Sequence, residues 1–294
     1  MTRVVLLTGA TGFLGRHLCR ALLEGGHTVE AIRRHSSDLA RLGPLAGQVR
    51  WHRAPEELEA AFSGPRIPDA LIHCAALYGR RGESPLELLE ANTLLPLRLY
   101  QLAAQRGVPL FLNTDTVLDP ALDLYALSKS HGAQWLMRAG GPTRVLNLKI
   151  QHFYGPGDDP AKFITWLITQ CLANVPEIPL TDGRQQRDFV YVTDVVSAML
   201  ALLECETSGS APGGGFANYE IGTGDAVPVR ELVELVHQLT GSRSRLSFGA
   251  VAYRPGEPRL TRADTSALRA LGWRPLVQLP EGLARTIEGE RKRL

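Results

Sequence analysis

A glycine-rich segment near the start of the chain constrains the fold more than any other feature. The run VVLLTGA, residues 4–10, is continuously apolar and β-branched up to its end, which is typical of a strand buried on both faces. It leads into Gly9, Gly12 and Gly15, spaced as GxxGxxG. Apolar positions then recur at helical spacing until two glycines end the pattern. A strand, a glycine turn and a helix in this order predict a dinucleotide-binding fold.

The alternation of strand and helix continues over about the first 150 residues. Strand-like HTVEAI, LIHCAA, LFLNTD and RVLNLKI are separated by helical segments such as PLELLEANTLLPLRLYQLAAQRG. This order predicts an α/β fold with a Rossmann-type doubly wound parallel sheet. Glycine and proline clusters after Ile150 indicate a smaller C-terminal α/β lobe. We expect the Rossmann domain at residues 1–151 and about 189–206, and the smaller lobe at 152–188 and about 217–294.

Composition disfavours several other classes of protein. A net charge of +2 over 294 residues is not the excess of positive charge that is typical of nucleic-acid-binding proteins. The apolar run at the N-terminus is too short for a signal peptide or a membrane span, so we expect no membrane partner. Four widely spaced cysteines in apolar runs predict reduced core residues in a cytoplasmic protein. Neither the cysteines nor the histidines have metal-ligand spacing, and we predict no metal.

The end of the second predicted strand bears on the choice of dinucleotide. A carboxylate at this position accepts hydrogen bonds from the ribose 2′-hydroxyl of NAD. Here the strand HTVEAI ends in Arg33 and Arg34, and the one nearby acid, Glu30, precedes the strand end. Two guanidinium groups suit a 2′-phosphate, which favours NADPH/NADP over NAD; a solvated basic turn is the alternative.

Three residues later in the chain have the chemistry of proton transfer. Tyr125 and Lys129 are four residues apart and therefore share one face of a helix. A lysine ammonium beside a phenol lowers the pKa of the phenol, which suits Tyr125 to exchange a proton near neutral pH. Thr114, at the end of its predicted strand, can hydrogen-bond the same substrate oxygen. A YxxxK spacing alone is common, but here it follows a dinucleotide fingerprint and a strand-end hydroxyl.

These motifs give the chain a resemblance to a known family. GATGFLG near the start, HCAA at 73–76 and YALSK at 125–129 resemble the extended short-chain dehydrogenase/reductases, within them the NAD(P)-dependent nucleotide-sugar epimerase/dehydratase/reductase group. Asn92 and the segments 154–158, 187–194, 221–224 and 254–257 match family positions in the same order. NTDT, YGPGDDPAKF, QQRDFVYV and FGAVAYRPGE resemble the CDP-abequose synthase type of 4-ketoreductase.

The resemblance implies roles for the cofactor-side residues. Tyr125 would be general acid to a carbonyl oxygen, Lys129 would tune Tyr125 and hold the nicotinamide ribose, and Thr114 would orient the carbonyl. Asn92 would support the cofactor side, with a capping or core role as the alternative. The expected cofactor-binding residues are Gly9, Thr11, Gly12, Phe13, Leu14, Gly15, Arg33, Arg34, Cys74, Ala75, Ala76, Asn92, Tyr125 and Lys129.

The resemblance also implies a nucleotide-diphosphate sugar as substrate. Arg187 and Arg254 match the family arginines that hold the diphosphate, for which an arginine fork is suited. Glu257 matches an acid that reaches ribose hydroxyls, and His152 lies where relatives often have a sugar-nucleotide-binding asparagine. Asp115 and Thr116 are expected to contact substrate at the strand end.

Thr116 distinguishes among the reactions of this family. Its dehydratases carry Thr-Asp-Glu at the strand end, where the two acids expel water from the sugar. This chain has Thr114-Asp115-Thr116, and a hydroxyl cannot take a carbon-bound proton as a carboxylate can. Dehydration is therefore disfavoured.

Three functions remain open from the sequence. The favoured one is NADPH-dependent reduction of the C4 ketone of a CDP- or dTDP-linked 4-keto-6-deoxyhexose in deoxysugar biosynthesis, because the two arginines favour a consumed reductant. The alternatives are an NAD-dependent nucleotide-sugar 4-epimerase and an NADP-binding redox-sensing regulator. By analogy with relatives, we expect a homodimer formed through helices near 87–105 and 125–139.

Overall fold

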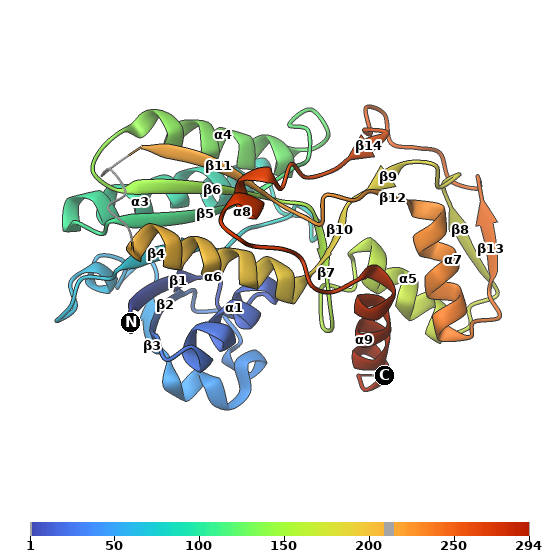
Figure 1. The fold of residues 1–294 in the computed structure, drawn as a ribbon, viewed down its shortest axis with the longest axis horizontal. Coiled ribbons are helices and arrows are strands. Elements are labelled where there is room, and N and C mark those ends of the chain that lie inside the picture. Colours follow the sequence, from blue (N-terminus) through green and yellow to red (C-terminus); the bar gives the residue numbers. More distant parts are fainter. Residues whose placement is uncertain (1, 209–214, 294) are drawn as a thin grey trace. The chain divides into compact units, whose positions relative to one another are not determined.

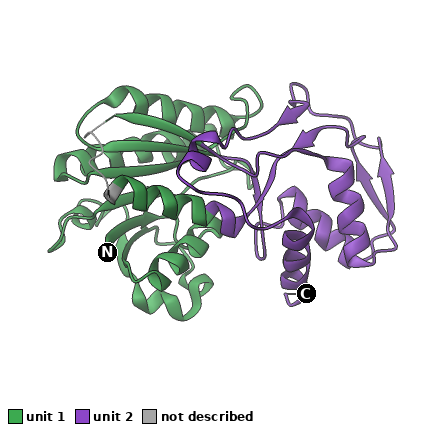
Figure 2. Ribbon diagram, in the orientation of Figure 1, with its two compact units in different colours: residues 1–149, 196–219 green, residues 150–195, 220–294 purple. Residues whose placement is uncertain are grey.

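The structure of the protein is a computed structural model that describes residues 2–208 and 215–293. It divides into two compact units (Figure 2). Unit 1 comprises Met1–Lys149 and Val196–Tyr219, and unit 2 comprises Ile150–Val195 and Glu220–Leu294. The chain therefore leaves unit 1 after Lys149, returns to it within a helix at Val196, and leaves it again after Tyr219.

Unit 1 contains a seven-stranded sheet with the strand order β11-β6-β5-β4-β1-β2-β3. The pairs β1–β2, β2–β3, β1–β4 and β4–β5 are parallel, which confirms the predicted doubly wound sheet. The order reverses between β1 and β4, and ligands of such sheets bind at the carboxyl ends of the strands at this point. The strands are β1 (Val4–Thr8), β2 (Thr28–Arg33), β3 (Arg50–Arg53), β4 (Ala70–His73), β5 (Leu110–Thr116), β6 (Arg144–Ile150) and β11 (Phe216–Ile221).

Helices cover both faces of this sheet, with α3 and α4 on one face and α1 and α6 on the other (Figure 1). The long predicted helical segment after β4 is continuous but contains one π-helical turn, η3, between α2 and α3. The helical elements are α1 (Phe13–Glu24), η1 (Leu39–Gln48), η2 (Ala60–Phe62), α2 (Pro85–Leu89), η3 (Glu90–Leu94), α3 (Leu95–Arg106), α4 (Leu124–Ala139) and α6 (Val192–Ser208).

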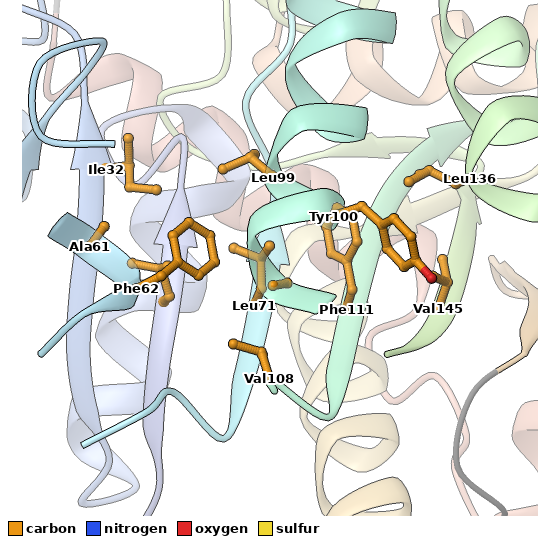
Figure 3. Close-up of a cluster of buried hydrophobic side chains, with 12 residues drawn as sticks. Ile32, Ala61, Phe62, Leu71, Leu99, Tyr100, Val108, Phe111, Leu136 and Val145 are labelled. Atoms are coloured by element: carbon orange, nitrogen blue, oxygen red, sulfur yellow. The ribbon is translucent and has the colours of Figure 1, made fainter. Parts of the chain in front are cut away.

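A buried apolar cluster holds α3 and α4 against the middle of the sheet (Figure 3). Leu71 and Phe111 come from β4 and β5, Leu99 and Tyr100 from α3, and Leu136 from α4. The rings of Tyr100 and Phe111 are stacked with centroids 6.4 Å apart. Because this cluster excludes water from the helix–sheet interface, it fixes the position of α4 relative to the strand ends.

The start and the packing of α4 are set by local chemistry. Asp123 is its N-cap, and the carboxylate accepts a hydrogen bond of 2.8 Å from the Ala126 N–H. Tyr125 consequently lies in the first turn and Lys129 one turn later. A Cβ at Gly132 would lie 2.5 Å from the Asn92 carbonyl oxygen, so glycine allows α4 to approach η3 closely.

Unit 2 consists of short strands and helices tied together by buried acids. The Asp188 carboxylate accepts hydrogen bonds from the Thr223 N–H and hydroxyl, at 2.8 and 2.7 Å, and from the Gly224 N–H. These bonds connect the junction of β9 and β10 with the segment after β11. The elements are β7 (His152–Tyr154), α5 (Phe163–Leu172), β8 (Glu177–Leu180), β9 (Gln186–Arg187), β10 (Phe189–Tyr191), β12 (Val227–Pro228), α7 (Val229–Thr240), β13 (Arg245–Phe248), β14 (Leu260–Thr261), α8 (Ser266–Ala270) and α9 (Leu279–Arg291).

The cysteines differ in burial. Cys19 and Cys171 are buried and Cys74 is half-buried, but Cys205 is exposed, contrary to the prediction of four core residues. The reason is that α6 presents Glu204 and Cys205 to solvent near its C-terminus. Within residues 2–208 and 215–293, no helix has the length and apolar character needed to cross a membrane.

Candidate active site

The predicted glycine turn joins β1 to α1 in a space where side chains do not fit. Gly9 has a φ of +72°, and a Cβ on it would lie 2.6 Å from the Ala75 nitrogen. A Cβ on Gly15 would lie 2.0 Å from the Gly9 oxygen. The Gly12 N–H donates to the same oxygen at 2.8 Å, which closes the turn. The carboxyl ends of β1 and β4 are therefore held close together at the point where the strand order reverses.

The N-terminus of α1 points out of this turn without a cap. Gly12 is the N-cap residue, has no side chain to accept the first N–H groups, and no acidic residue occurs in the first turn. Exposed N–H groups and the helix dipole attract an anion at this position. The turn also leaves a space that a Cβ on its glycines would fill. This space and the uncapped helix N-terminus fit the pyrophosphate of a dinucleotide at Gly12, Phe13 and Leu14.

The segment that follows β4 lines the same turn. The Cys74 N–H donates to the Thr8 carbonyl oxygen at 3.2 Å, and the Ala75 N–H donates to the Thr8 hydroxyl at 3.3 Å. Burial raises the pKa of the Cys74 thiol to about 12, so this thiol stays protonated and is not a nucleophile. The turn at Gly9 is thus lined by three uncharged residues, Cys74, Ala75 and Ala76.

The two arginines at the end of β2 have no acidic partner among the described residues. Neither Arg33 nor Arg34 forms an ion pair with another residue in the part of the chain that the structure describes, and the Arg33 Nε is buried without a hydrogen-bond partner there. Arg33 also lies beside Arg53 in the register of β2 and β3. Two acids that follow β3 have other partners. Glu56 pairs with His35, and Glu57 pairs with Arg53.

Glu30 is directed away from the strand end, as expected. Its carboxylate is buried and lies 2.7 Å from the His52 Nε2 and 3.6 Å from Arg50. Glu30 precedes the end of β2 by three residues and is occupied by these partners. It does not supply the carboxylate that a ribose 2′-hydroxyl would need.

The structure brings together Thr114, Tyr125 and Lys129 on β5 and α4. Lys129 is buried, and its Nζ donates to the Thr114 carbonyl oxygen at 2.5 Å. The Thr114 hydroxyl donates to the His73 carbonyl oxygen at 2.9 Å, so it must rotate before it can donate to a substrate carbonyl. The side chain that hydrogen-bonds Tyr125 is that of Thr116.

The prediction that Lys129 lowers the pKa of Tyr125 is wrong for this structure. Burial raises the pKa of Tyr125 well above its ordinary value, and Tyr78 and Asp115 raise it further. The charge that most lowers this pKa is that of Arg80. The Lys129 ammonium is instead directed to a backbone carbonyl, and burial lowers the pKa of Lys129 itself. Tyr125 is thus a protonated phenol at neutral pH.

Asp115 is held within the protein instead of facing a ligand. One of its oxygens accepts from the Asn147 amide and the other from the Thr116 N–H, both at 2.8 Å. Asn147 also bonds Asn113 and Asn218, which forms a polar ladder across β5, β6 and β11. Alternation along β5 directs Asp115 to the face opposite Thr114 and Thr116. Each Asp115 oxygen can accept a second hydrogen bond, so its contact with substrate stays a prediction.

Asn92 links the loop after β4 to α4. Its amide accepts from the Leu77 N–H at 3.0 Å and donates to the Leu77 carbonyl oxygen at 2.8 Å. It also donates to the Ser128 hydroxyl at 3.0 Å, and Ser128 in turn donates to the Tyr125 carbonyl oxygen. Asn92 therefore joins the loop to the helix that carries Tyr125 and Lys129.

Two of the predicted substrate residues form an ion pair within unit 2. Arg187 is buried, and its Nη2 donates to Glu257 at 2.7 Å. Arg254 is exposed in the turn where its carbonyl oxygen accepts from the Glu257 N–H. Glu257, predicted to reach ribose hydroxyls, has one oxygen committed to Arg187.

His152, also in unit 2, is a neutral side chain with spare hydrogen-bonding capacity. Burial and the charges of Arg187 and Lys162 lower its pKa to about 4. Its Nδ1 is buried and has no hydrogen-bond partner among the described residues, while its ring packs edge-on against Phe189. A neutral imidazole with an unused nitrogen suits a polar, uncharged group of a ligand.

Sequence reasoning missed Tyr78. Its ring lies over that of Tyr125, with centroids 4.9 Å apart. The available signal was its place shortly after β4, because residues that follow the central strands of such sheets line the ligand crevice.

Residues 5–222 match the family described as the NAD dependent epimerase/dehydratase family. The chain belongs to this family. It is 31% identical over 294 residues to the CDP-abequose synthase of Salmonella typhimurium, covering 95% of both chains, which confirms the predicted resemblance. Family and fold together identify an enzyme that uses a nicotinamide dinucleotide.

Solved structures share this fold over almost the full chain. The UDP-glucose 4-epimerase of Thermotoga maritima with UDP-glucose has a TM-score of 0.83 at 25% identity, covering 99% of each chain. MoeE5 in complex with UDP-glucuronic acid and NAD has a TM-score of 0.81 at 31% identity, also covering 99% of each chain.

Substitution of Gly15 tests the glycine turn. Gly15→Ala should weaken dinucleotide binding about tenfold or more, because overpacking of this kind costs about 1–3 kcal/mol and displaces the turn. The dissociation constant would be measured by calorimetric titration. Gly47→Ala is the matched control, since a Cβ there meets nothing within 4 Å. Equal affinity of the Gly15→Ala variant and the wild type would contradict the assignment.

Proposed function

We propose that the protein reduces the C4 ketone of a CDP- or dTDP-linked 4-keto-6-deoxyhexose with NADPH, in deoxysugar biosynthesis. The coarser assignment is secure: the chain is an enzyme of the epimerase/dehydratase family, whose relatives act on nucleotide sugars. The observation that carries the finer proposal is the environment of Tyr125. It combines a protonated, half-buried phenol with a hydroxyl at Thr116, where a dehydratase has a glutamate.

The reaction needs a proton at the carbonyl oxygen as the carbonyl carbon is reduced. The dinucleotide, when bound, supplies hydride to that carbon. Tyr125 holds the proton, because its raised pKa keeps the phenol neutral. Thr116 hydrogen-bonds the phenol, and Thr114 would turn its hydroxyl from His73 to the substrate oxygen. Lys129 anchors α4 to the end of β5 and would hold the nicotinamide ribose.

An NAD-dependent 4-epimerase is the alternative, favoured by the NAD bound to structural relatives such as MoeE5. An epimerase starts by oxidising an alcohol, so its tyrosine must first act as a base. A reductase needs the acid form at the start. The raised pKa of Tyr125 fits the acid form that a reduction needs at its start. The two arginines at the end of β2 support NADPH, since no described acid pairs with them.

Unit 1 would then bind the dinucleotide and unit 2 the nucleotide sugar. Arg187 and Arg254 would hold the diphosphate, with Glu257 fixing Arg187 through their ion pair. His152 would offer its unused Nδ1 to the sugar nucleotide. Thr116 would contact the sugar near C4 through the same hydroxyl that bonds Tyr125.

We also propose a cytoplasmic homodimer. The free cysteines suit a reducing compartment. The outer surface of α3 and α4 carries a shallow apolar depression, and the Trp135 side chain beside it is 57% exposed. An exposed tryptophan over such a depression is typical of an interface. The depression is lined by Leu97, Tyr100, Gln101, Ala104, Gln105, Trp135 and Ala139.

Tyr125→Phe tests the general-acid assignment. It should lower kcat by about 10²- to 10⁴-fold, because it removes the proton without changing the ring, and should leave NADPH binding nearly unchanged. The measurement is single-turnover oxidation of NADPH with CDP- and dTDP-linked 4-keto-6-deoxyglucose. A variant that keeps its rate would exclude Tyr125 as the acid.

The pair Arg33→Gln and Arg34→Gln tests the choice of dinucleotide. The double variant should raise the KM for NADPH about tenfold or more, since a hydrogen bond to a charged group contributes about 1.5–3 kcal/mol. The KM for NADH should change little, because NADH has no 2′-phosphate. Arg20→Gln, an exposed arginine on α1, is the control for loss of charge. Equal rises for both dinucleotides would rule out a phosphate clamp.

A further inference from the structure

The loop between β4 and α2, residues 74–84, is fixed at both ends. At its start, the Asn92 amide binds both the N–H and the carbonyl oxygen of Leu77. At its end, Ser84 and Glu87 form a capping box that begins α2. Because the backbone on either side of the middle segment is held, the residues between these anchors have little freedom to move.

Glycines shape the middle of this loop. Gly79 and Gly82 have φ values of +71° and +82°, and they enclose Arg80 and Arg81. A Cβ on Gly79 would contact the Leu88 side chain of α2 at 3.4 Å, which shows how closely the loop packs at this point. The left-handed residue Gly79 lies between Tyr78 and Arg80 and lets these two side chains lie near each other.

Tyr78 and Arg80 form a layered arrangement with Tyr125. The rings of Tyr78 and Tyr125 have centroids 4.9 Å apart and planes inclined by 32°. The Arg80 guanidinium carbon lies 5.4 Å from the centroid of the Tyr78 ring. Ring separations of this size are those of favourable aromatic pairs, and a guanidinium at this distance is attracted to the ring face.

The charged and titratable groups around the Tyr125 phenol come from three elements. The loop contributes Tyr78 and Arg80, β5 contributes Asp115 with the hydroxyl of Thr116, and α4 contributes Lys129 one turn away. Tyr78 raises the pKa of Tyr125, whereas Arg80 lowers it. Two neighbours on one loop therefore act on the phenol in opposite directions.

We propose that Tyr78 and Arg80 form a cover over Tyr125. In this cover, Tyr78 is a positioning residue that holds the phenol in its reactive orientation. Arg80 holds a positive charge against the Tyr78 ring. The stack restricts rotation of the phenol about its side-chain bonds and limits the access of water to one of its faces. This cover rests on the proposed role of Tyr125 as the general acid. In this proposal, Tyr78 itself transfers no proton.

Tyr78→Ala tests the positioning role. It should lower kcat about tenfold or more, since a displacement of about 1 Å at a reacting group can cost about 10²-fold, with little change in the KM for the sugar nucleotide. Tyr78→Phe keeps the ring and should keep kcat close to that of the wild type. Dinucleotide binding and thermal unfolding of each variant, measured on the full chain, check that it is folded.

The pH profile of kcat separates positioning from a merely structural role. Reduction requires protonated Tyr125, so activity is present below the pKa of Tyr125 and is lost as the pH rises through it. Tyr78→Phe removes a group that raises this pKa and should move the alkaline limb to lower pH. Arg80→Gln removes a cation that lowers it and should move the limb to higher pH. Arg106→Gln is the control. Arg106 is exposed at the end of α3, before the amino end of β5, whereas Thr116 lies at the carboxyl end of that strand.

The outcomes distinguish this inference from the proposed function. If Tyr125→Phe stays active, the general-acid assignment fails and the cover fails with it. If Tyr125→Phe is inactive but Tyr78→Ala keeps the wild-type kcat and the two loop variants leave the alkaline limb unmoved, only the cover is excluded. Loss of kcat in Tyr78→Phe as large as that in Tyr125→Phe would make Tyr78 a proton donor and overturn its positioning role.

Discussion

The close packing of α4 against the π-helical turn η3 is the constraint on which the site depends. Gly132 lets the two backbones approach, and the Thr93 hydroxyl donates to the Ser128 carbonyl oxygen at 2.7 Å across the same contact. Asn92, from the same turn, holds both Ser128 and the loop at Leu77. One short segment of irregular helix thus fixes both α4 and the loop after β4, a use of π-turns common at functional sites.

Burial of the phenol links this packing to chemistry. A solvated tyrosine beside a lysine would be poised to lose its proton, but Tyr125 is half-buried against Tyr78 and Lys129 is directed to the end of β5. The phenol therefore stays neutral at neutral pH and would donate a proton in the proposed reduction. The same arrangement commits Asp115 to Asn147 and leaves only a hydroxyl at Thr116. Dehydration is the family reaction that needs a second acid at this position, and this chain lacks it.

The sequence predicted the parts of the site that depend on local pattern. The strand before Gly9, the helix after it and the placement of Tyr125 and Lys129 on one helix follow from periodicity and turn chemistry, and the structure has them. It did not predict the contact of Tyr78 with Tyr125, because that contact joins two segments only after the sheet forms. The direction of the Tyr125 pKa shift was predicted wrongly for the same reason: burial and the direction of the Lys129 side chain are tertiary properties.

The central claim is that the enzyme consumes a reductant to reduce a ketone. The most direct measurement incubates the purified full chain with NADPH and CDP- or dTDP-linked 4-keto-6-deoxyglucose, and follows NADPH oxidation together with the sugar product. The account predicts one NADPH consumed for each C4 alcohol formed, with the dinucleotide released after each turnover. Interconversion of C4 epimers by protein that retains NAD, with no net consumption of dinucleotide, would contradict it.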